Sequence, residues 1–189
     1  MQEQTFNPTN IAIKYGIVIG VINMLLLTTI YYISTSLLVN MWYGIVNFTV
    51  GIAIYSFFCL KLRKVIGGYW SFREAFKGIF IMLFFSGFIY STFSFLFFKY
   101  IETDAYMQLS TIYMDETAQM LEKTGAKQEL IDETIEQGLV ALKQQFQPAF
   151  KQWGQVLSIS ILVYFVIAAI FSLIFKKDEP IYLSKNEMD

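Results

Sequence analysis

The spacing of the charged residues is the feature that most constrains how this chain can fold. Three long stretches contain no Asp, Glu, Lys or Arg: residues 15–60, 78–98 and 152–175. They hold 46, 21 and 24 residues, whereas a helix rising about 1.5 Å per residue needs about 20 to cross a ~30 Å hydrocarbon core. Since the first stretch is long enough for two crossings, the pattern predicts four membrane-spanning helices.

The boundary between the first two crossings is readable in ISTSLLVNMWYG, where polar residues and a glycine interrupt an aliphatic and aromatic run. We place the spans at about residues 14–33, 42–60, 77–98 and 155–175. An isolated strand in lipid would leave its backbone groups unpaired, so each span is expected to be helical. With 56% hydrophobic and 15% charged residues, the composition also favours a membrane protein. The predicted fold is all-α, with one transmembrane domain over residues 1–189 and a tail at 176–189.

The segment 99–154 reads differently from the spans. Apolar residues recur at helical spacing from Ala105 to Lys123 and again from Gln128 to Phe146, and Gly125 stands between the two runs. Acidic residues cross both runs, which makes them too polar to span a membrane. We therefore expect an amphipathic helical hairpin inserted between the third and fourth spans.

The orientation follows from Lys and Arg near the ends of the spans. The loop at 61–77 has five basic residues and one acid, and Lys176 and Lys177 follow the last span directly. The segment 99–154 instead has five lysines and nine acids. The distribution predicts that both termini are cytoplasmic and that the hairpin lies outside the cytoplasm.

The stretch YWSFREAFKGIF, residues 69–80, sets three charges between two apolar runs. Ser71 followed by Glu74 three residues later is a capping box, in which each side chain pairs with an exposed backbone N–H at a helix start. Arg73 and Lys77 suit an entry turn at the level of the lipid headgroups. We interpret Ser71, Arg73, Glu74 and Lys77 as a helix cap and membrane-interface motif.

Polar and small residues inside the spans are the other candidates. Asn23 and Asn47 are intramembrane amides that are expected to form hydrogen bonds between helices, with a substrate contact as the alternative. Gly16 and Gly20 form a GxxxG face in the first span, which favours close helix packing within one chain or between chains.

The sequence contains few residues that match known catalytic or cofactor-binding motifs. The chain contains no His and a single Cys, Cys59, so Ser-His and Cys-His arrangements and His-ligated metals are excluded. No phosphate-binding glycine loop is present, and a net charge of −1 argues against nucleic-acid binding. We expect no cofactor, no metal and no enzymatic activity.

Several elements together resemble a known family. The motif SFREAFKGIF after a basic loop, its continuation FFSGFIYSTFSFLFFKYIETD, and a final span closing on Lys-Lys are similar to the family catalogued as domain of unknown function 4199. The resemblance covers nearly the whole chain. It implies a four-span inner-membrane protein of gram-negative bacteria, with no known activity and no catalytic residues to carry over.

Three functions are compatible with these observations. The first is a non-enzymatic scaffold or accessory subunit whose hairpin contacts a membrane protein partner. The second is a small oligomeric transporter or channel, with Asn23, Asn47 and the serines of the third span along a path. The third, with the least support, is a membrane enzyme on lipid or envelope substrates. In each case the lipid bilayer is a partner, and a homo-oligomer is compatible with the glycine face.

Overall fold

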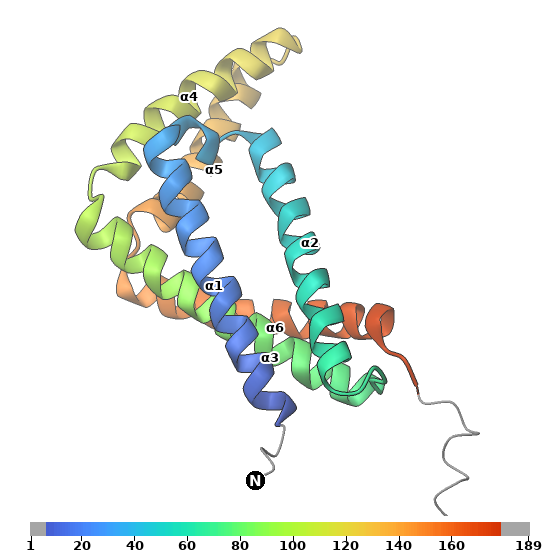
Figure 1. The fold of residues 1–189 in the computed structure, drawn as a ribbon. Helices are drawn as coiled ribbons and strands as arrows, with labels where there is room; N and C mark the ends of the chain where they lie inside the picture. Colours follow the sequence, from blue (N-terminus) through green and yellow to red (C-terminus); the bar gives the residue numbers. More distant parts are fainter. Residues whose placement is uncertain (1–6, 179–189) are drawn as a thin grey trace, which may run out of the picture. The chain divides into compact units, whose positions relative to one another are not determined.

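The computed structural model describes residues 7–178, and its regular elements there are all helical (Figure 1). They are α1 (Pro8–Ile33), the 3-10 helix η1 (Thr35–Leu38), α2 (Met41–Val65), α3 (Phe72–Leu96), the π-helix η2 (Phe97–Ile101), α4 (Ala105–Lys123), α5 (Gln128–Phe146) and α6 (Phe150–Phe175). Four segments are long and apolar enough to cross a membrane: α1, α2, α3 continued by η2, and α6. The prediction of an all-α chain with four spans is therefore confirmed.

The spanning helices extend beyond the apolar runs because local signals at their ends continue the helix. At the start of α1, the Asn7 Oδ1 accepts a hydrogen bond of 3.0 Å from the Thr9 N–H, and Pro8 occupies the first helical position. At the end of α2, Gly67 and Gly68 adopt φ values of 110° and 89°, which other residues rarely tolerate. The Gly68 N–H then donates to the Arg63 carbonyl at 2.9 Å, which pairs one of the last carbonyls of the helix.

The described residues divide into two compact units. Unit 1 comprises residues 7–22, 51–89 and 158–178, and unit 2 comprises residues 23–50 and 90–157. Each of the four spanning helices contributes residues to both units, and each unit has a buried cluster of its own.

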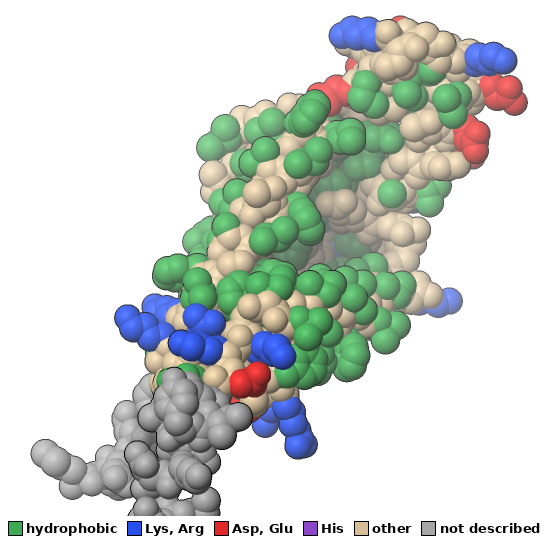
Figure 2. All heavy atoms as spheres, turned by 90° about the vertical axis from the view of Figure 1, so that its right-hand side faces the viewer, with side chains coloured by type: hydrophobic (Ala, Val, Ile, Leu, Met, Phe, Trp, Pro, Cys, Tyr) green, Lys and Arg blue, Asp and Glu red, His purple; other side chains and the backbone are tan. Residues whose placement is uncertain are grey.

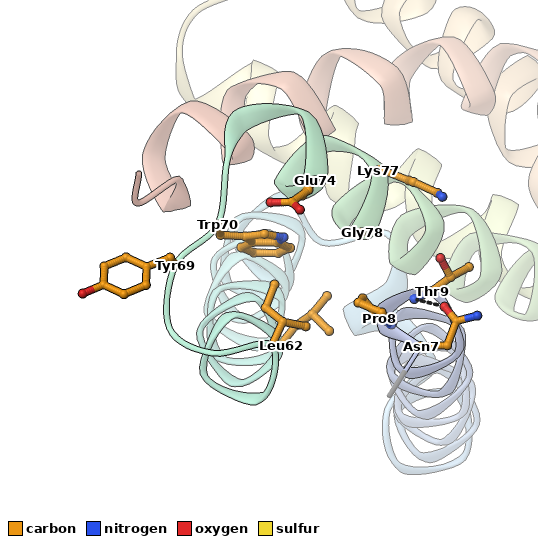
Figure 3. A pocket seen from close by; sticks show the side chains of 10 residues that line it. Asn7, Pro8, Thr9, Leu62, Tyr69, Trp70, Glu74, Lys77 and Gly78 are labelled. Atoms are coloured by element: carbon orange, nitrogen blue, oxygen red, sulfur yellow. Dashed lines mark hydrogen bonds between the residues drawn. The ribbon is translucent and has the colours of Figure 1, made fainter. Parts of the chain in front are cut away.

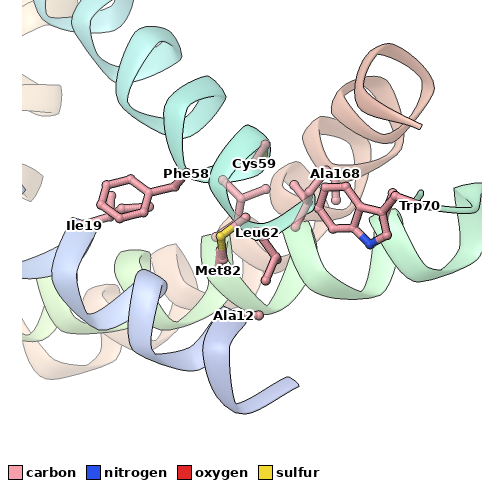
Figure 4. Close-up of a cluster of buried hydrophobic side chains, with 11 residues drawn as sticks. Ala12, Ile19, Phe58, Cys59, Leu62, Trp70, Met82 and Ala168 are labelled. Carbon is pink, nitrogen blue, oxygen red and sulfur yellow. The ribbon is translucent and has the colours of Figure 1, made fainter. Parts of the chain in front are cut away.

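The core of unit 1 joins α1, α2, α3 and α6. Its buried residues are Ala12, Ile19, Phe58, Cys59, Leu62, Trp70, Ala75, Ile79, Met82, Leu83 and Ala168. Figure 4 shows Cys59 and Leu62 of α2 close to Met82 of α3, with Trp70 on the side of Ala168. Small residues on α1, α3 and α6 let larger side chains from neighbouring helices fill the space between them.

The core of unit 2 joins the end of α1, the end of α3 with η2, and the two helices α4 and α5. It contains Leu27, Tyr31, Phe97, Phe98, Ala105, Leu109, Leu142 and Phe146. The rings of Phe98 and Phe146 meet edge to face with their centroids 4.8 Å apart, a favourable geometry for two aromatic rings. This cluster therefore holds the α4–α5 pair against the end of the spanning helices.

The helices α4 and α5 lie side by side and are joined by a short turn (Figure 1). Gly125 makes the turn with φ of 74°, the positive value for which glycine is favoured. Gly138 of α5 leaves room for the Tyr113 ring of α4, which would collide with any Cβ at this position. The two runs read from the sequence thus pack as a pair.

Large apolar side chains cover the outward faces of the spanning helices. Phe48 in α2 is 69% exposed and Leu162 in α6 is 70% exposed. Figure 2 shows hydrophobic side chains spread over one face of these helices. Exposed apolar surface on this scale is costly in water and favourable against lipid chains. The chain is accordingly a multi-pass membrane protein in contact with the bilayer.

Candidate functional site at the basic end of unit 1

The start of α3 carries the hydrogen bonds of a capping box. The Ser71 N–H donates to the Glu74 Oε2 at 3.1 Å, and the Glu74 N–H donates to the Ser71 Oγ at 3.4 Å. The Ser71 hydroxyl also donates to the same carboxylate oxygen at 2.7 Å. Both bonds to the Glu74 carboxylate use Oε2, so the helix start is fixed while Oε1 of Glu74 has no hydrogen-bond partner within the described chain.

The backbone just before α3 pairs with the backbone just after α6. The Trp70 N–H donates to the Lys177 carbonyl at 2.7 Å, and the Lys177 N–H donates to the Trp70 carbonyl at 2.9 Å. The Arg63 Nη1 donates to the Phe175 carbonyl at 3.2 Å, which pairs an acceptor at the end of α6. The ends of α2, α3 and α6 are thereby tied together in unit 1.

A pocket of about 380 Å³ lies beside this junction (Figure 3). The walls come from the start of α1, the end of α2 and the start of α3. The lining residues are Asn7, Pro8, Thr9, Leu62, Ile66, Tyr69, Trp70, Glu74, Lys77 and Gly78. Trp70 is only 2% exposed, and its ring lies where a Cβ on Gly78 would come within 2.9 Å of it. Trp70 and Gly78 thus form a fixed part of the wall.

Basic residues dominate the charge of this part of unit 1. Its described Lys and Arg residues are Lys14, Lys61, Arg63, Lys64, Arg73, Lys77, Lys176 and Lys177, and its described acids are Glu74 and Asp178. Figure 2 shows several Lys and Arg side chains gathered in this region. The Lys177 ammonium lies 5.4 Å from the centre of the Tyr69 ring, a cation–π contact. An excess of positive charge suits anionic groups of the membrane surface.

A second polar group, inside the helices of unit 1, was missed by the sequence reasoning. The hydroxyls of Tyr55 in α2 and Ser86 in α3 form a short hydrogen bond, and Ser86 also donates to the Leu83 carbonyl at 3.1 Å. Gly87 leaves space for the Tyr164 hydroxyl of α6, since a Cβ there would collide with it. Hydropathy identifies Tyr55 and Tyr164 only as aromatic residues, and no spacing rule pairs Tyr55 with a serine on another helix.

A third polar group lies in unit 2 at the end of α1. The Glu102 carboxylate accepts hydrogen bonds from the Tyr31 hydroxyl at 3.0 Å and from the Tyr32 hydroxyl at 2.5 Å. The π-helix Phe97–Ile101 precedes Glu102 directly. No sequence pattern indicates this contact, because the two tyrosines and the carboxylate are about seventy residues apart.

The remaining predicted residues are placed as follows. Arg73 and Lys77 are exposed on α3. Asn23 is half-buried and Asn47 is exposed, and neither amide has a side-chain hydrogen bond within residues 7–178, so the predicted interhelical bonds stay a prediction. Gly16 and Gly20 are both buried in unit 1, where α1 passes close to α3.

No group of three or more Cys, Asp or Glu residues that could hold a metal ion comes together in the part of the chain that the structure describes. What the fold does define is a class: an all-helical multi-pass membrane protein with a helical pair between its third and fourth spans. Residues 14–177 match the family model described as Protein of unknown function (DUF4199), and the chain belongs to this family. Searches of curated proteins and of solved structures found no match.

Proposed function

We propose that this protein acts through contacts, as a non-enzymatic scaffold or accessory subunit whose α4–α5 pair meets a membrane protein partner outside the cytoplasm. One observation carries the proposal. Glu102, just before α4, is held by hydrogen bonds from Tyr31 and Tyr32 at the end of α1. A carboxylate held by two hydroxyls ties the base of the helix pair to a spanning helix by charge-assisted bonds.

Packing in unit 2 also supports a docking role for the α4–α5 pair. Leu109 of α4 is fully buried, as is Phe146 of α5, and both lie in one cluster with Phe98 of η2. A recognition element that is ordered before it meets its partner loses less conformational freedom on binding. The α4–α5 pair therefore has the rigidity expected of a docking element.

The surface of the pair offers both apolar and charged contacts. Met107 and Met120 on α4 and Val140 on α5 are more than half exposed, although they lie outside the spanning helices. Acidic side chains such as Glu133 and Glu136 are exposed on α5. Exposed methionines adapt to varied surfaces, and carboxylates favour a partner that carries basic groups.

The distribution of charge supports the orientation that this proposal needs. In the described chain, unit 1 has eight basic residues and two acids, whereas unit 2 has five lysines and nine acids. Basic residues close to spans are retained on the cytoplasmic side. We therefore place the 66–71 loop and both termini in the cytoplasm and the α4–α5 pair outside, in the inner membrane that the family resemblance implies.

The transport alternative is less compatible with the geometry. That hypothesis needs the serines of the third span along a path, but Ser86 has no exposed surface and is hydrogen-bonded to Tyr55 in the core of unit 1. Asn47 is exposed on α2, and its side chain has no hydrogen bond within the described residues. An enzymatic role would need a reactive group, and the single thiol, Cys59, is fully buried among apolar side chains.

The proposal is tested by crosslinking in intact membranes, followed by affinity purification and mass spectrometry. Wild-type protein should yield one defined partner with crosslinks in residues 102–149. Glu133→Gln combined with Glu136→Gln should reduce its recovery at equal expression, by roughly tenfold if two charged contacts are lost. The matched control, Asp115→Asn with Glu116→Gln, makes the same change of charge on α4.

The outcomes separate the hypotheses. Loss of the partner in the double variant of α5, with the partner retained in the double variant of α4, supports a defined docking surface. Recovery of the protein itself without any partner would contradict the accessory role and favour the hypothesis of an oligomeric transporter. Flux through reconstituted vesicles of the Asn23→Ala and Asn47→Ala variants then becomes the deciding measurement.

A further inference from the structure

We propose that the pocket at the basic end of unit 1 binds a phospholipid headgroup that carries both a phosphate and a primary ammonium. This site is independent of the contacts proposed for the α4–α5 pair, since every residue that lines it belongs to unit 1. A volume of about 380 Å³ is within the usual range for small-molecule sites.

The pocket presents two opposite charges that do not neutralise each other. Glu74 and Lys77 are three residues apart on α3, a spacing at which ion pairs commonly form. Within the described residues, however, no ion pair joins them, and the Lys77 ammonium has no other polar partner. In Figure 3 the two side chains extend from α3 in opposite directions. The pocket thus keeps one free anionic and one free cationic contact.

Glu74 can serve its helix and a ligand together. The bonds that its carboxylate accepts from Ser71 both use Oε2, so Oε1 remains able to accept a hydrogen bond from an ammonium. Lys77 can donate to a phosphate oxygen, and both contacts would be charge-assisted. A headgroup with phosphate alone would meet an unfavourable carboxylate, whereas a quaternary ammonium has no N–H to donate. The donor set therefore selects a zwitterionic headgroup with a primary amine.

Nearby basic side chains do not complicate this assignment. Arg63 donates to the Phe175 carbonyl, and Lys177 lies over the Tyr69 ring. Arg73, although exposed close by on α3, does not line the pocket. Lys77 is thus the single basic residue among those that line the cavity.

The location favours a lipid over a soluble molecule of the same chemistry. The walls come from the terminal turns of three helices that are long and apolar enough to cross a membrane, so the pocket lies at the level of the headgroups. Pro8, Leu62 and Ile66 provide apolar lining, which suits the glycerol and upper acyl regions of a phospholipid. The Trp70 ring in the wall is typical of residues at the membrane interface.

The test is lipid retention by the full-length protein, measured by native mass spectrometry after exchange into mild detergent. The probes are dioleoyl phosphatidylethanolamine, phosphatidylglycerol and phosphatidylcholine at equal concentration. Wild-type protein should retain the ethanolamine lipid about tenfold more than either of the others. Soluble glycerophosphoethanolamine, added in excess, should not displace it if the lipid chains contribute to binding.

Substitutions of the charged pocket residues test whether the lipid binds in this pocket. Lys77→Gln and Glu74→Gln should each abolish most of the preference, and glutamine at position 74 can still cap the helix. Arg73→Gln is the matched control and should keep the preference. Equal retention of the three lipids by wild-type protein, a preference unchanged in both pocket variants, or an equal loss in Arg73→Gln would overturn the assignment. Displacement by glycerophosphoethanolamine would overturn the lipid as the source of the headgroup. The wild-type comparison decides the matter even if a variant does not fold.

Discussion

The Cα of Gly16 in α1 faces the backbone of Met82 in α3: a Cβ built on Gly16 would lie 2.8 Å from the Met82 carbonyl oxygen and 2.9 Å from the Phe85 Cβ. One turn further on, a Cβ on Gly20 would lie 3.0 Å from the Cβ of Ile89. Backbone and Cβ atoms cannot move aside as the tip of a long side chain can. The GxxxG face is thus used inside the chain, between α1 and α3 of unit 1.

Gly16→Ala should therefore destabilise the protein, by about 1–3 kcal/mol, as expected for overpacking of a close contact. Gly44→Ala is the matched control, because a Cβ there would meet nothing within 4 Å beyond the backbone of its own helix turn. That change should leave stability unaffected or raise it by up to about 1 kcal/mol through helix propensity. Thermal unfolding in detergent compares the two variants. An equal loss of stability in both would mean that the α1–α3 contact is not the cause.

Removal of the Tyr55 hydroxyl should cost about 0.5–1.5 kcal/mol, because the Ser86 hydroxyl keeps its bond to the Leu83 carbonyl but loses its partner on α2 in the core of unit 1. Tyr55→Phe tests this, with Tyr100→Phe as the control at a ring that is 68% exposed. A double-mutant cycle with Ser86→Ala isolates the pair. Strict additivity of the two changes would show that the bond contributes nothing measurable.

Proline at position 177 should loosen the junction beside the pocket. Lys177→Pro removes the N–H that donates to the Trp70 carbonyl and leaves an acceptor beside a buried ring unpaired, at a cost of about 1–3 kcal/mol. Lys177→Ala keeps the backbone bonds and loses only the contact with Tyr69. Limited proteolysis of the 66–71 loop should be faster in the proline variant. Equal protection in both variants would contradict a role for the backbone pairing.

Cysteine labelling should report the proposed orientation. Cys59 is fully buried and should resist a membrane-impermeant maleimide in the folded protein. In a Cys59→Ala background, we expect Thr124→Cys, at the turn between α4 and α5, to react from outside the cytoplasm. Lys64→Cys, near the end of α2, should react only after the membrane is permeabilised. The reverse pattern would invert the topology and place the pocket on the other side.

The chain's charge pattern was sufficient to predict the spans because charge is excluded from the hydrocarbon core over a length that helix geometry fixes. Local motifs were also readable: Ser71 and Glu74 are three residues apart, and Gly125 separates two periodic runs. Such features depend only on neighbours in sequence. The observed helix ends differ from the predicted span ends by several residues, because capping groups such as Asn7 lie outside the apolar runs.

Long-range polar pairings could not be predicted in this way. Tyr55 pairs with Ser86, and Glu102 pairs with Tyr31 and Tyr32, across different helices. Their formation depends on which faces of the helices meet, and hydropathy contains no such information. The pocket is a similar case, since its walls come from three separate segments. Lys77 was identified as an interface residue, but its place in the wall of the same pocket as Glu74 required the fold.

The pairing of Trp70 with Lys177 has a consequence for biosynthesis. Trp70 precedes the third span and Lys177 follows the fourth, so the two backbone bonds can form only after the ribosome has delivered the last helix to the membrane. Until then, an indole that will be almost fully enclosed lacks part of its surroundings, and the pocket lacks a fixed wall. Membrane insertion of α6 is therefore the step that completes this region, and a chain halted before it would expose Trp70 to the cell's quality control.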